Sequence, residues 1–280
     1  MQGPREKYVG TTALGCAVER SSTPYSAHWD VSSSYLFLTN LENRVVTLAV
    51  TMLTMQRVNT PEILDSDACP TVEAEASLRD LCRINRWFGG VATTRKLIER
   101  LASATGNRSF SVLEVAAGFG EVSKAAGRQL VRKGISLEVT DLDRARAHLV
   151  RGNRAVVADA LALPFQDNSF DLVSCSLFAH HLEPAELAHF TGEALRVSRC
   201  AVLINDLVRH PMHLALVYAG FAVMRSYVSR VDGLASVRRA YVPDEMRQIL
   251  SSAARPPARM EISRHFLFRM GVIAWKKSHC

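Results

Sequence analysis

The sequence has no long uninterrupted apolar run. Its most apolar early stretch, residues 35–53, is broken by Glu42, Asn43 and Arg44, whereas a membrane-spanning helix needs roughly 20 apolar residues in succession. The stretch also starts too late for a signal peptide and lacks a clear small-residue cleavage site. We therefore expect no stable membrane insertion and a cytoplasmic protein.

Paired cysteine motifs are also missing. The chain has six cysteines among 280 residues, and none of them lies in the CxxC spacing that is typical of zinc sites or redox pairs. A chain of this length does not need disulfides to hold a small core together. We expect reduced thiols, no disulfide framework and no bound metal.

Runs of like charge are absent, although the net charge is +7. The whole excess lies in residues 205–280, which hold 12 basic and 5 acidic side chains. Such a segment can face an anionic partner or simply be a solvated surface. Because basic and aromatic residues are not interleaved, nucleic acid is not the expected partner.

Residues 1–54 differ from the rest of the chain, because they are rich in Ser and Thr and show little periodicity before residue 35. We interpret them as a poorly specified extension that adds little to the fold. Residues 55–108 carry apolar side chains at helical spacing and end in Gly106-Asn107, which predicts a helical cap. Residues 109–280 then form the main domain, with 207–258 as an insert.

The most informative segment is VLEVAAGFG, residues 112–120. A buried strand ends in an acid and enters a turn of Ala116, Ala117, Gly118 and Gly120, whose small side chains let a ligand approach the backbone. The next residues have helical spacing, so the free N–H groups of a helix start face that ligand. This geometry is typical of a nucleotide site.

Strands and helices alternate along the main domain, which predicts right-handed crossovers and a parallel sheet. Two closing strands, RMEISRHF and RMGVIAWKK, should form an antiparallel edge pair. The remaining strands are expected at residues 110–116, 136–141, 155–159, 170–176 and 200–206, and helices near 121–133, 143–151, 184–197, 211–229 and from Pro243.

Three acids fall at expected strand ends, where a nucleoside needs them. Asp141 follows Gly120 by 21 residues, a separation at which a carboxylate can accept both ribose hydroxyl hydrogen bonds. Asp159 and the N–H of Ala160 are placed to meet the adenine edge. Glu114 should lie beside the turn.

VLEVAAGFG, VTDLD and DALALPFQDNSFDLVSCSLFAHHL together resemble the motifs of class I S-adenosylmethionine-dependent methyltransferases, in the branch of the ubiquinone and menaquinone biosynthesis enzymes. The resemblance implies an α/β, Rossmann-like three-layer sandwich, with a seven-stranded, mostly parallel sheet and an antiparallel last strand. It implies S-adenosyl-L-methionine as cofactor, with Glu114 near its methionine end, Asp141 on the ribose and Asp159 on the adenine. It adds Leu142 and Ser176 to the site.

This chain departs from the family pattern at Ala116, where the family usually has glycine. One methyl group is a small intrusion, so we expect cofactor binding to be kept. The partner would be a small-molecule methyl acceptor, and the chain a monomer or a homodimer.

Two alternatives to a methyltransferase stay open. A methyltransferase-like subunit would bind the cofactor without turnover. A nicotinamide-dependent dehydrogenase fits less well, because Gly118 to Ser123 imitates GxGxxG but places serine at the third glycine.

Methyl transfer can need a base at the acceptor. We rank His181 first, then His180, then His210, because all three follow strands at the carboxyl edge of the sheet and only histidine titrates near neutrality without unusual burial. The alternative is that the paired histidines only open the next helix.

The acceptor site is expected at the same edge. Arg209 would hold an acidic hydroxyl or carboxylate beside Asp206, or the two would pair structurally. Arg86 and Trp87 would close over the acceptor, or Trp87 would be core. Tyr218 belongs to an insert with apolar and arginine side chains. This composition suggests a partly apolar acceptor that can be anionic, such as a quinone precursor, polyketide or aromatic acid.

Overall fold

The computed structural model describes residues 55–65, 69–149 and 154–277. The chain divides into two units, residues 1–48 and residues 49–280. The prediction for residues 1–54 lies outside the described residues. Within the described part, Met55 already makes a contact, because its carbonyl oxygen accepts a hydrogen bond from Arg209 Nε at 2.5 Å.

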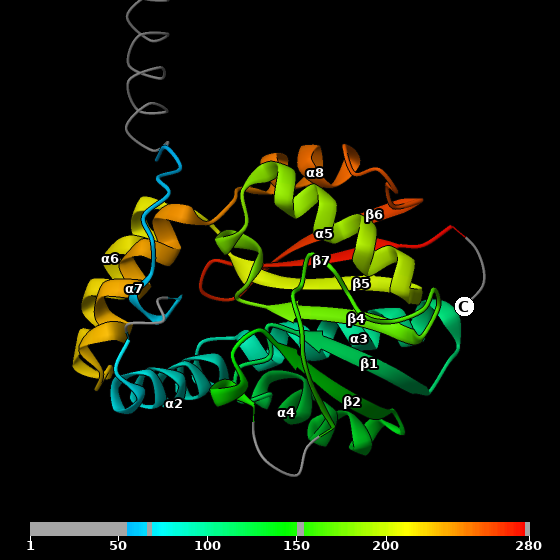
Figure 1. Cartoon of the computed structure of the whole chain (residues 1–280), viewed down its shortest axis with the longest axis horizontal. Helices are drawn as coiled ribbons and strands as arrows, with labels where there is room; N and C mark the ends of the chain where they lie inside the picture. The colour runs from blue at the N-terminus through cyan, green and yellow to red at the C-terminus, as the bar shows by residue number, and fades with distance from the viewer. Residues whose placement is uncertain (1–54, 66–68, 150–153, 278–280) are drawn as a thin grey trace, which may run out of the picture. The chain divides into compact units, whose positions relative to one another are not determined.

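A seven-stranded sheet forms the centre of the second unit, in the order β3-β2-β1-β4-β5-β7-β6 (Figure 1). The first five strands in this order pair in parallel, and β7 runs antiparallel to both of its neighbours. This topology confirms the predicted fold class and the antiparallel closing pair. The strands are β1 (Ser109–Val115), β2 (Ser136–Asp143), β3 (Ala155–Val157), β4 (Phe170–Ser176), β5 (Ser198–Leu207), β6 (Arg259–His265) and β7 (Arg269–Trp275).

Helices cover both faces of this sheet. On one face, α3 (Gly90–Thr105) and α4 (Glu121–Leu130) pack against it. On the other face lie α5 (Pro184–Val197) and α8 (Pro243–Ser251). The side chains of β1 alternate accordingly, since Phe110 and Val112 belong to the core cluster of α3 whereas Leu113 and Val115 belong to that of α5. Because α3 packs directly on the sheet, it is part of the sandwich rather than of a cap.

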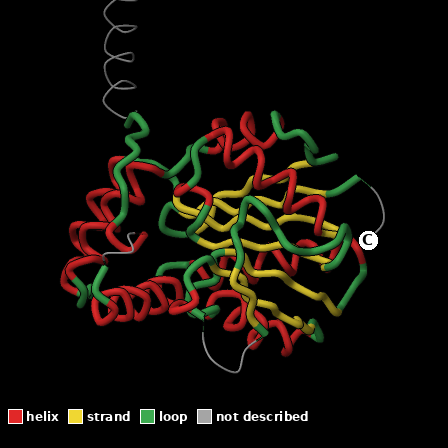
Figure 2. Tube along the Cα trace, viewed as in Figure 1, coloured by secondary structure: helices red, strands yellow, loops and turns green. Residues whose placement is uncertain are grey.

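Three further helices group together beyond the carboxyl ends of the parallel strands (Figures 1 and 2). They are α2 (Thr71–Trp87), α6 (Pro211–Ala219) and α7 (Tyr227–Arg239), and α7 contacts both of the others. Asp232 on α7 accepts the backbone N–H groups of Ile63 and Leu64 at 2.8 and 2.9 Å. These bonds tie the segment that precedes α2 to the same group of helices.

Two of the predicted helices are shorter than expected. Before α2, in the predicted helical cap, the chain forms a 3-10 turn at Ile63–Asp65. Instead of a helix over 143–151, β2 continues to Asp143 and a 3-10 turn follows at Arg146–His148; residues 150–153 lie outside the described part. The cause is Asp143, whose carboxylate accepts the N–H of Ala145 at 2.9 Å and favours a turn.

The predicted helix over 211–229 is broken into α6, a 3-10 turn at Gly220–Ala222 and α7. Ser226 caps α7, because its hydroxyl accepts the N–H of Val228 at 3.1 Å. Asp80 on α2 accepts the N–H groups of Arg225 and Ser226, both at 2.8 Å. These bonds satisfy backbone groups that a continuous helix would have used, so the break is built into the packing.

The described cysteines do not all follow the prediction. Cys69, Cys82 and Cys175 have free thiols, but Cys200 is disulfide-bonded, so the expectation of reduced thiols throughout is wrong at this position. No helix within the described residues is both long and apolar enough to cross a membrane.

Candidate active site

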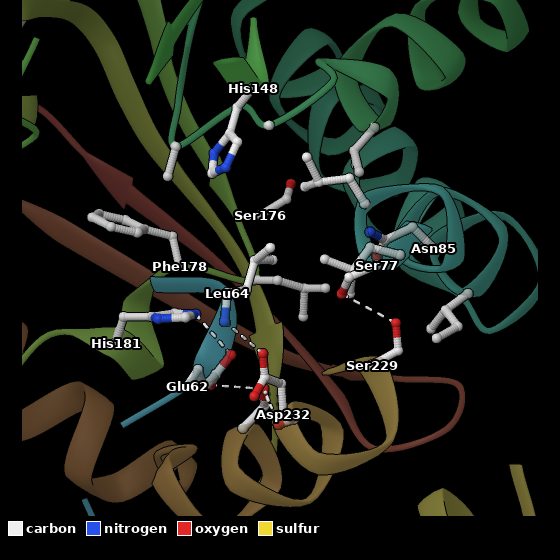
Figure 3. Close-up of a pocket in the computed structure, with 18 of the residues that line it drawn as sticks. Glu62, Leu64, Ser77, Asn85, His148, Ser176, Phe178, His181, Ser229 and Asp232 are labelled. Atoms are coloured by element: carbon white, nitrogen blue, oxygen red, sulfur yellow. Dashed lines mark hydrogen bonds and ion pairs between the residues drawn. The ribbon is translucent and has the colours of Figure 1, made fainter. Parts of the chain in front are cut away.

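A cavity of about 1450 Å³ opens at the carboxyl ends of the parallel strands. The ends of β1, β2 and β4 border one part of it, and α2, α6 and α7 border the other. Figure 3 shows His148 and Ser176 on one side, with Ser77, Asn85 and Ser229 across the space from them. Ligands of open α/β sheets bind at this edge.

The turn after β1 approaches the cavity with left-handed backbone. Ala116, Gly118 and Gly120 have φ angles of 53°, 54° and 65°. Ala116 and Gly118 line the cavity, but Gly120 does not. Instead Gly120 lies over Asp141, and a Cβ there would come within 2.5 Å of the Asp141 carboxylate. Glycine is therefore needed at 120 for packing against β2.

The structure separates the roles of the two acids in VTDLD. Asp141 is buried, forms an ion pair with Lys124 and does not line the cavity. Asp143, two residues later and on the same side of the strand, does line it. The Asp143 carboxylate accepts the N–H of Gly118 at 2.9 Å and lies 3.3 Å from His148 Nδ1.

Burial alone would raise the pKa of Asp143, but its hydrogen bonds with His148 and with the backbone N–H groups of Gly118 and Ala145 outweigh burial and lower the pKa. Asp143 is thus an anion at neutral pH. A carboxylate has about four lone-pair sites, so it can still accept ligand hydroxyl groups.

Glu114, at the end of β1, also lines the cavity and is almost fully buried. It accepts a hydrogen bond from the hydroxyl of Ser123 on α4. Burial raises the pKa of Glu114, and the Ser123 hydrogen bond only partly opposes this effect. Leu142 and Ser176 also line the cavity, and their contact with a cofactor stays a prediction.

Asp159 and Ala160 lie at the exposed rim of the cavity, beyond the end of β3 at Val157. The Asp159 carboxylate accepts the N–H of Leu161 at 2.8 Å. The predicted adenine contacts therefore remain geometrically available, at the edge of the cavity rather than inside it.

His180 is held between two carboxylates. Its Nδ1 lies 2.6 Å from Asp206 Oδ1, and its Nε2 lies 3.4 Å from Glu62 Oε1. Burial would lower the pKa of the imidazole, but Asp206 and then Glu62 raise it to about 10. His180 is consequently an imidazolium at neutral pH and has no lone pair with which to accept a proton.

His181 lies beside this network and lines the cavity with a partly exposed side chain. Its Nε2 is 3.7 Å from Glu62 Oε2, an approach drawn in Figure 3. The rings of His180 and His181 are 4.3 Å apart between centroids. Of the three predicted base candidates, His181 is the one that borders the cavity without being enclosed by carboxylates.

Glu62, His180 and His181 could also be considered as metal ligands, because one ligand atom from each lies within 4.8 Å of the others. The neighbours favour a different chemistry. Glu62 accepts the Ser236 hydroxyl at 2.9 Å and lies 3.8 Å from the Arg239 guanidinium, and His180 holds two protons. These three side chains are better suited to holding protons than to binding a metal ion. The absence of a metal stays a prediction.

The segment from β1 to the start of β5 has a recognisable family. Residues 113–200 match the protein-family model described as a methyltransferase domain. This segment of the chain is therefore a methyltransferase domain. The matched segment carries the turn after β1, Asp143, Asp159 and the two histidines, so the match includes one part of the cavity lining.

Among solved structures, one methyltransferase has a fold similar to that of this chain. The plantazolicin methyltransferase BpumL in complex with S-adenosylhomocysteine has a TM-score of 0.53 at 12% identity, covering 74% of this chain and 96% of that one. The magnesium protoporphyrin IX methyltransferase ChlM from Synechocystis PCC 6803 has a TM-score of 0.43 at 14% identity, covering 68% and 80%. A candidate methyltransferase from Bacillus halodurans C-125 has a TM-score of 0.40 at 22% identity, covering 59% of this chain and 71% of that one. None of the curated proteins compared matches the chain.

The residues predicted to bind the methyl acceptor do not line the cavity. Arg209 is ion-paired with Glu245 at 2.6 Å, and the Asp206 carboxylate is hydrogen-bonded to the His180 ring. Trp87 and Tyr218 have exposed fractions of 59% and 51%. None of the predicted set Arg86, Trp87, Asp206, Arg209 and Tyr218, nor the third base candidate His210, borders the cavity.

Several polar residues that were not predicted from the sequence reach the cavity through the fold. They come from segments far apart in the chain: Glu62, Ser77, Asn85, His148, His213, Ser229, Asp232 and Arg269. Only Asp143 and His148 had a local signal, because they follow the second predicted strand and share its turn. The others reach the cavity through the packing of α2, α6, α7 and β7, which no local pattern reveals.

Proposed function

We propose that the enzyme transfers the methyl group of S-adenosylmethionine to an oxygen atom of a small, largely apolar acceptor. The observation that carries this proposal is His181, which lies at the cavity wall beside a histidine whose proton is fixed by Asp206 and Glu62. An oxygen acceptor is the class that gains from a nearby base, because a hydroxyl must lose its proton on methylation.

The residues at the ends of β1, β2 and β4 suit the cofactor. Asp143 would accept the ribose hydroxyls, a role we move from Asp141 because Asp143 lines the cavity. Glu114, Ala116, Gly118 and Ser176 would border the methionine part, with Leu142, Asp159 and Ala160 toward the adenine. The left-handed turn at Gly118 supports the fit, since its backbone comes to the cavity without a side chain. The bound cofactor supplies an electrophilic methyl group.

The acceptor would occupy the part of the cavity that α2 and α6 border. Its lining there is largely apolar, which favours an acceptor with an aromatic or alkyl body. These side chains are Leu78 and Leu81 from α2, Leu216 and Val217 from α6, and Val223 and Met224 after it. A quinone precursor, as in the branch that the sequence resembles, a polyketide or an aromatic acid would fit this description.

The chain's own residues would orient the acceptor and remove its proton. His181 would take the hydroxyl proton on its imidazole. His180, as an imidazolium fixed by Asp206, would hold the 179–181 turn and keep Glu62 in place beside His181. Closely packed helices α2 and α7 would exclude water from the reacting atoms. We keep a monomer or homodimer as the expected assembly.

A two-stage assay tests the proposal. Calorimetry first measures S-adenosylhomocysteine binding by the purified full chain. Phenolic, quinone-like and polyketide acceptors are then screened for release of S-adenosylhomocysteine from S-adenosylmethionine, with mass spectrometry locating the added methyl group. O-methylated product supports the proposal, methylation at carbon or nitrogen would contradict the acceptor class, and binding without any turnover would favour a cofactor-binding subunit.

A further inference from the structure

We propose that Arg269 is an anion-binding residue of the acceptor site, so that the acceptor carries a carboxylate in addition to the atom that is methylated. The inference rests on the proposed function and narrows its substrate class. It starts from one feature of the cavity wall, a buried guanidinium group at the first residue of β7.

Arg269 has 2% of its surface exposed and lines the cavity. Its Nη2 donates to Asn85 Oδ1 at 2.9 Å, while its Nη1 is buried without a hydrogen-bond partner. No carboxylate of the described residues lies within ion-pair distance of it, in contrast to Arg209 and Arg239. Burial lowers the pKa of Arg269 to about 10, which leaves it charged at neutral pH.

A buried cation is costly unless charges and hydrogen bonds replace its lost hydration. The charge of Asp206, which is hydrogen-bonded to His180, offsets the burial of Arg269 only in part, and Nη1 keeps no hydrogen bond. A ligand acceptor at Nη1 would therefore complete the group. A carboxylate is the ligand that matches a guanidinium group, since its two oxygens can accept parallel hydrogen bonds from the planar fork. The unpaired Nη1 at the cavity wall supplies one of these donors.

The surroundings hold Arg269 in place. A Cβ on Gly90 would come within 2.3 Å of Asn85 Oδ1, so glycine at this position makes room for the side chain that orients the guanidinium. Gly89, the N-cap of α3, has a φ of 87°, and a Cβ on it would lie 3.1 Å from Phe266 O and 3.8 Å from Arg269 Cγ. The two glycines at the start of α3 thus pack beside Asn85 and Arg269.

The charges of the cavity wall single out Arg269. The lining contains one other arginine, Arg144, which is exposed, and no lysine among the described residues. His213, which is close enough to feel the charge of Arg269, is neutral, because burial lowers its pKa to about 4 and Arg269 adds to the effect. The other buried cation of the lining, His180, is already paired with Asp206 and Glu62. Arg269 is therefore the buried cation that is left for an acidic acceptor.

Simple carboxylates test the proposal without knowledge of the acceptor. The full chain, saturated with S-adenosylhomocysteine, is titrated with benzoate, phenylacetate and octanoate, each against its uncharged amide. We expect at least one carboxylate to bind about tenfold or more tightly than its amide, as for a hydrogen bond to a charged group. If no carboxylate is preferred over its amide, the proposal is overturned.

Variants then locate the preference. Arg269→Gln removes the charge but keeps a donor for Asn85, and should abolish the preference; Arg269→Lys should keep part of it. Arg86→Met, an exposed arginine one residue after Asn85, is the matched control and should bind like the wild type. A preference that survives Arg269→Gln would contradict the proposal, and the wild-type comparison decides even if that variant fails to fold.

Cofactor affinity separates this proposal from the function on which it rests. Arg269→Gln should bind S-adenosylhomocysteine within about threefold of the wild type. A tenfold loss would mean that Arg269 holds the cofactor's own carboxylate, which would overturn the acceptor assignment while leaving the methyltransferase function intact. A wild-type chain that does not bind S-adenosylhomocysteine would instead refute the proposed function.

Discussion

Asp206 holds His180 by two of that residue's groups, the ring Nδ1 at 2.6 Å and the backbone N–H at 3.0 Å. The two residues come from β5 and from the turn after β4, which are neighbouring strands of the sheet. Because each oxygen of the Asp206 carboxylate is hydrogen-bonded to His180, the backbone of the turn and the imidazole ring are held by the same side chain. The side chain next along, His181, is thereby presented to the cavity.

The His180 network predicts a pH dependence of stability. The pKa of His180 is raised from 6.5 to about 10 in the folded chain, so its stabilising contribution is complete below about pH 6.5 and is lost as the pH rises through 10. The pKa values of Glu62 and Asp206 are lowered in the folded chain, so these two carboxylates contribute stability that is lost as the pH falls into the acidic range. Stability should therefore fall on the alkaline side.

Urea unfolding of the wild type and of His180→Gln from pH 6 to pH 10 measures this effect. We expect the wild type to lose at least about 1.4 kcal/mol more over this range than the variant, the equivalent of one pKa unit. Parallel pH profiles of the two proteins would show that His180 is not held as an imidazolium.

His181 is predicted to act as the base. Replacing His181 with Gln should lower kcat by about 10² to 10⁴ on an accepted substrate, because proton removal contributes to the transition state. Cofactor affinity should not change. His210→Asn is the control, since asparagine can still cap α6 in place of His210, whose Nδ1 accepts the N–H of Met212.

The control should turn over at the wild-type rate. If His181→Gln does too, between pH 6 and pH 9, the acceptor needs only positioning, as a carbon or a preionised oxygen would.

Ala116 is predicted to be strained. Its φ of 53° lies in the left-handed region, which costs a residue with a Cβ about 1–2 kcal/mol. Ala116→Gly should relieve this strain, offset by about 0.5–1 kcal/mol from the greater freedom of glycine in the unfolded chain. We expect thermal unfolding of this variant at the same temperature or slightly higher, with undiminished S-adenosylhomocysteine binding. A markedly lower unfolding temperature of Ala116→Gly would contradict the prediction that the backbone at Ala116 is strained.

The sheet was predictable from sequence because each strand carries its own signal of buried apolar residues between turns. Strand length was harder to predict. The sequence alone favours Asp141 as the end of β2, but Asp143 pairs with Val157 and continues the ladder. Since alternate residues share a face, the two-residue extension keeps the carboxylate on the same side and moves it forward to the cavity.

The acceptor site could not be predicted in this way. Arg209 and Arg269 both stand at the carboxyl edge of the sheet, but Arg209 turns to Glu245 whereas Arg269 turns to Asn85 and the cavity. This choice depends on partners that are far apart in the sequence. The histidine pair, in contrast, was found because it directly follows β4 at the edge where ligands bind.

The placement of the cofactor is tested most directly by calorimetry of S-adenosylhomocysteine binding to the wild type, Asp143→Ala and Asp141→Asn. The account predicts that the wild type binds one molecule per chain and that Asp143→Ala weakens binding by about 1.5–3 kcal/mol, the range for hydrogen bonds to a charged group. Asp141→Asn, outside the cavity lining, should bind within about threefold of the wild type. Equal affinity of Asp143→Ala and the wild type, or a wild type that does not bind, would contradict the account.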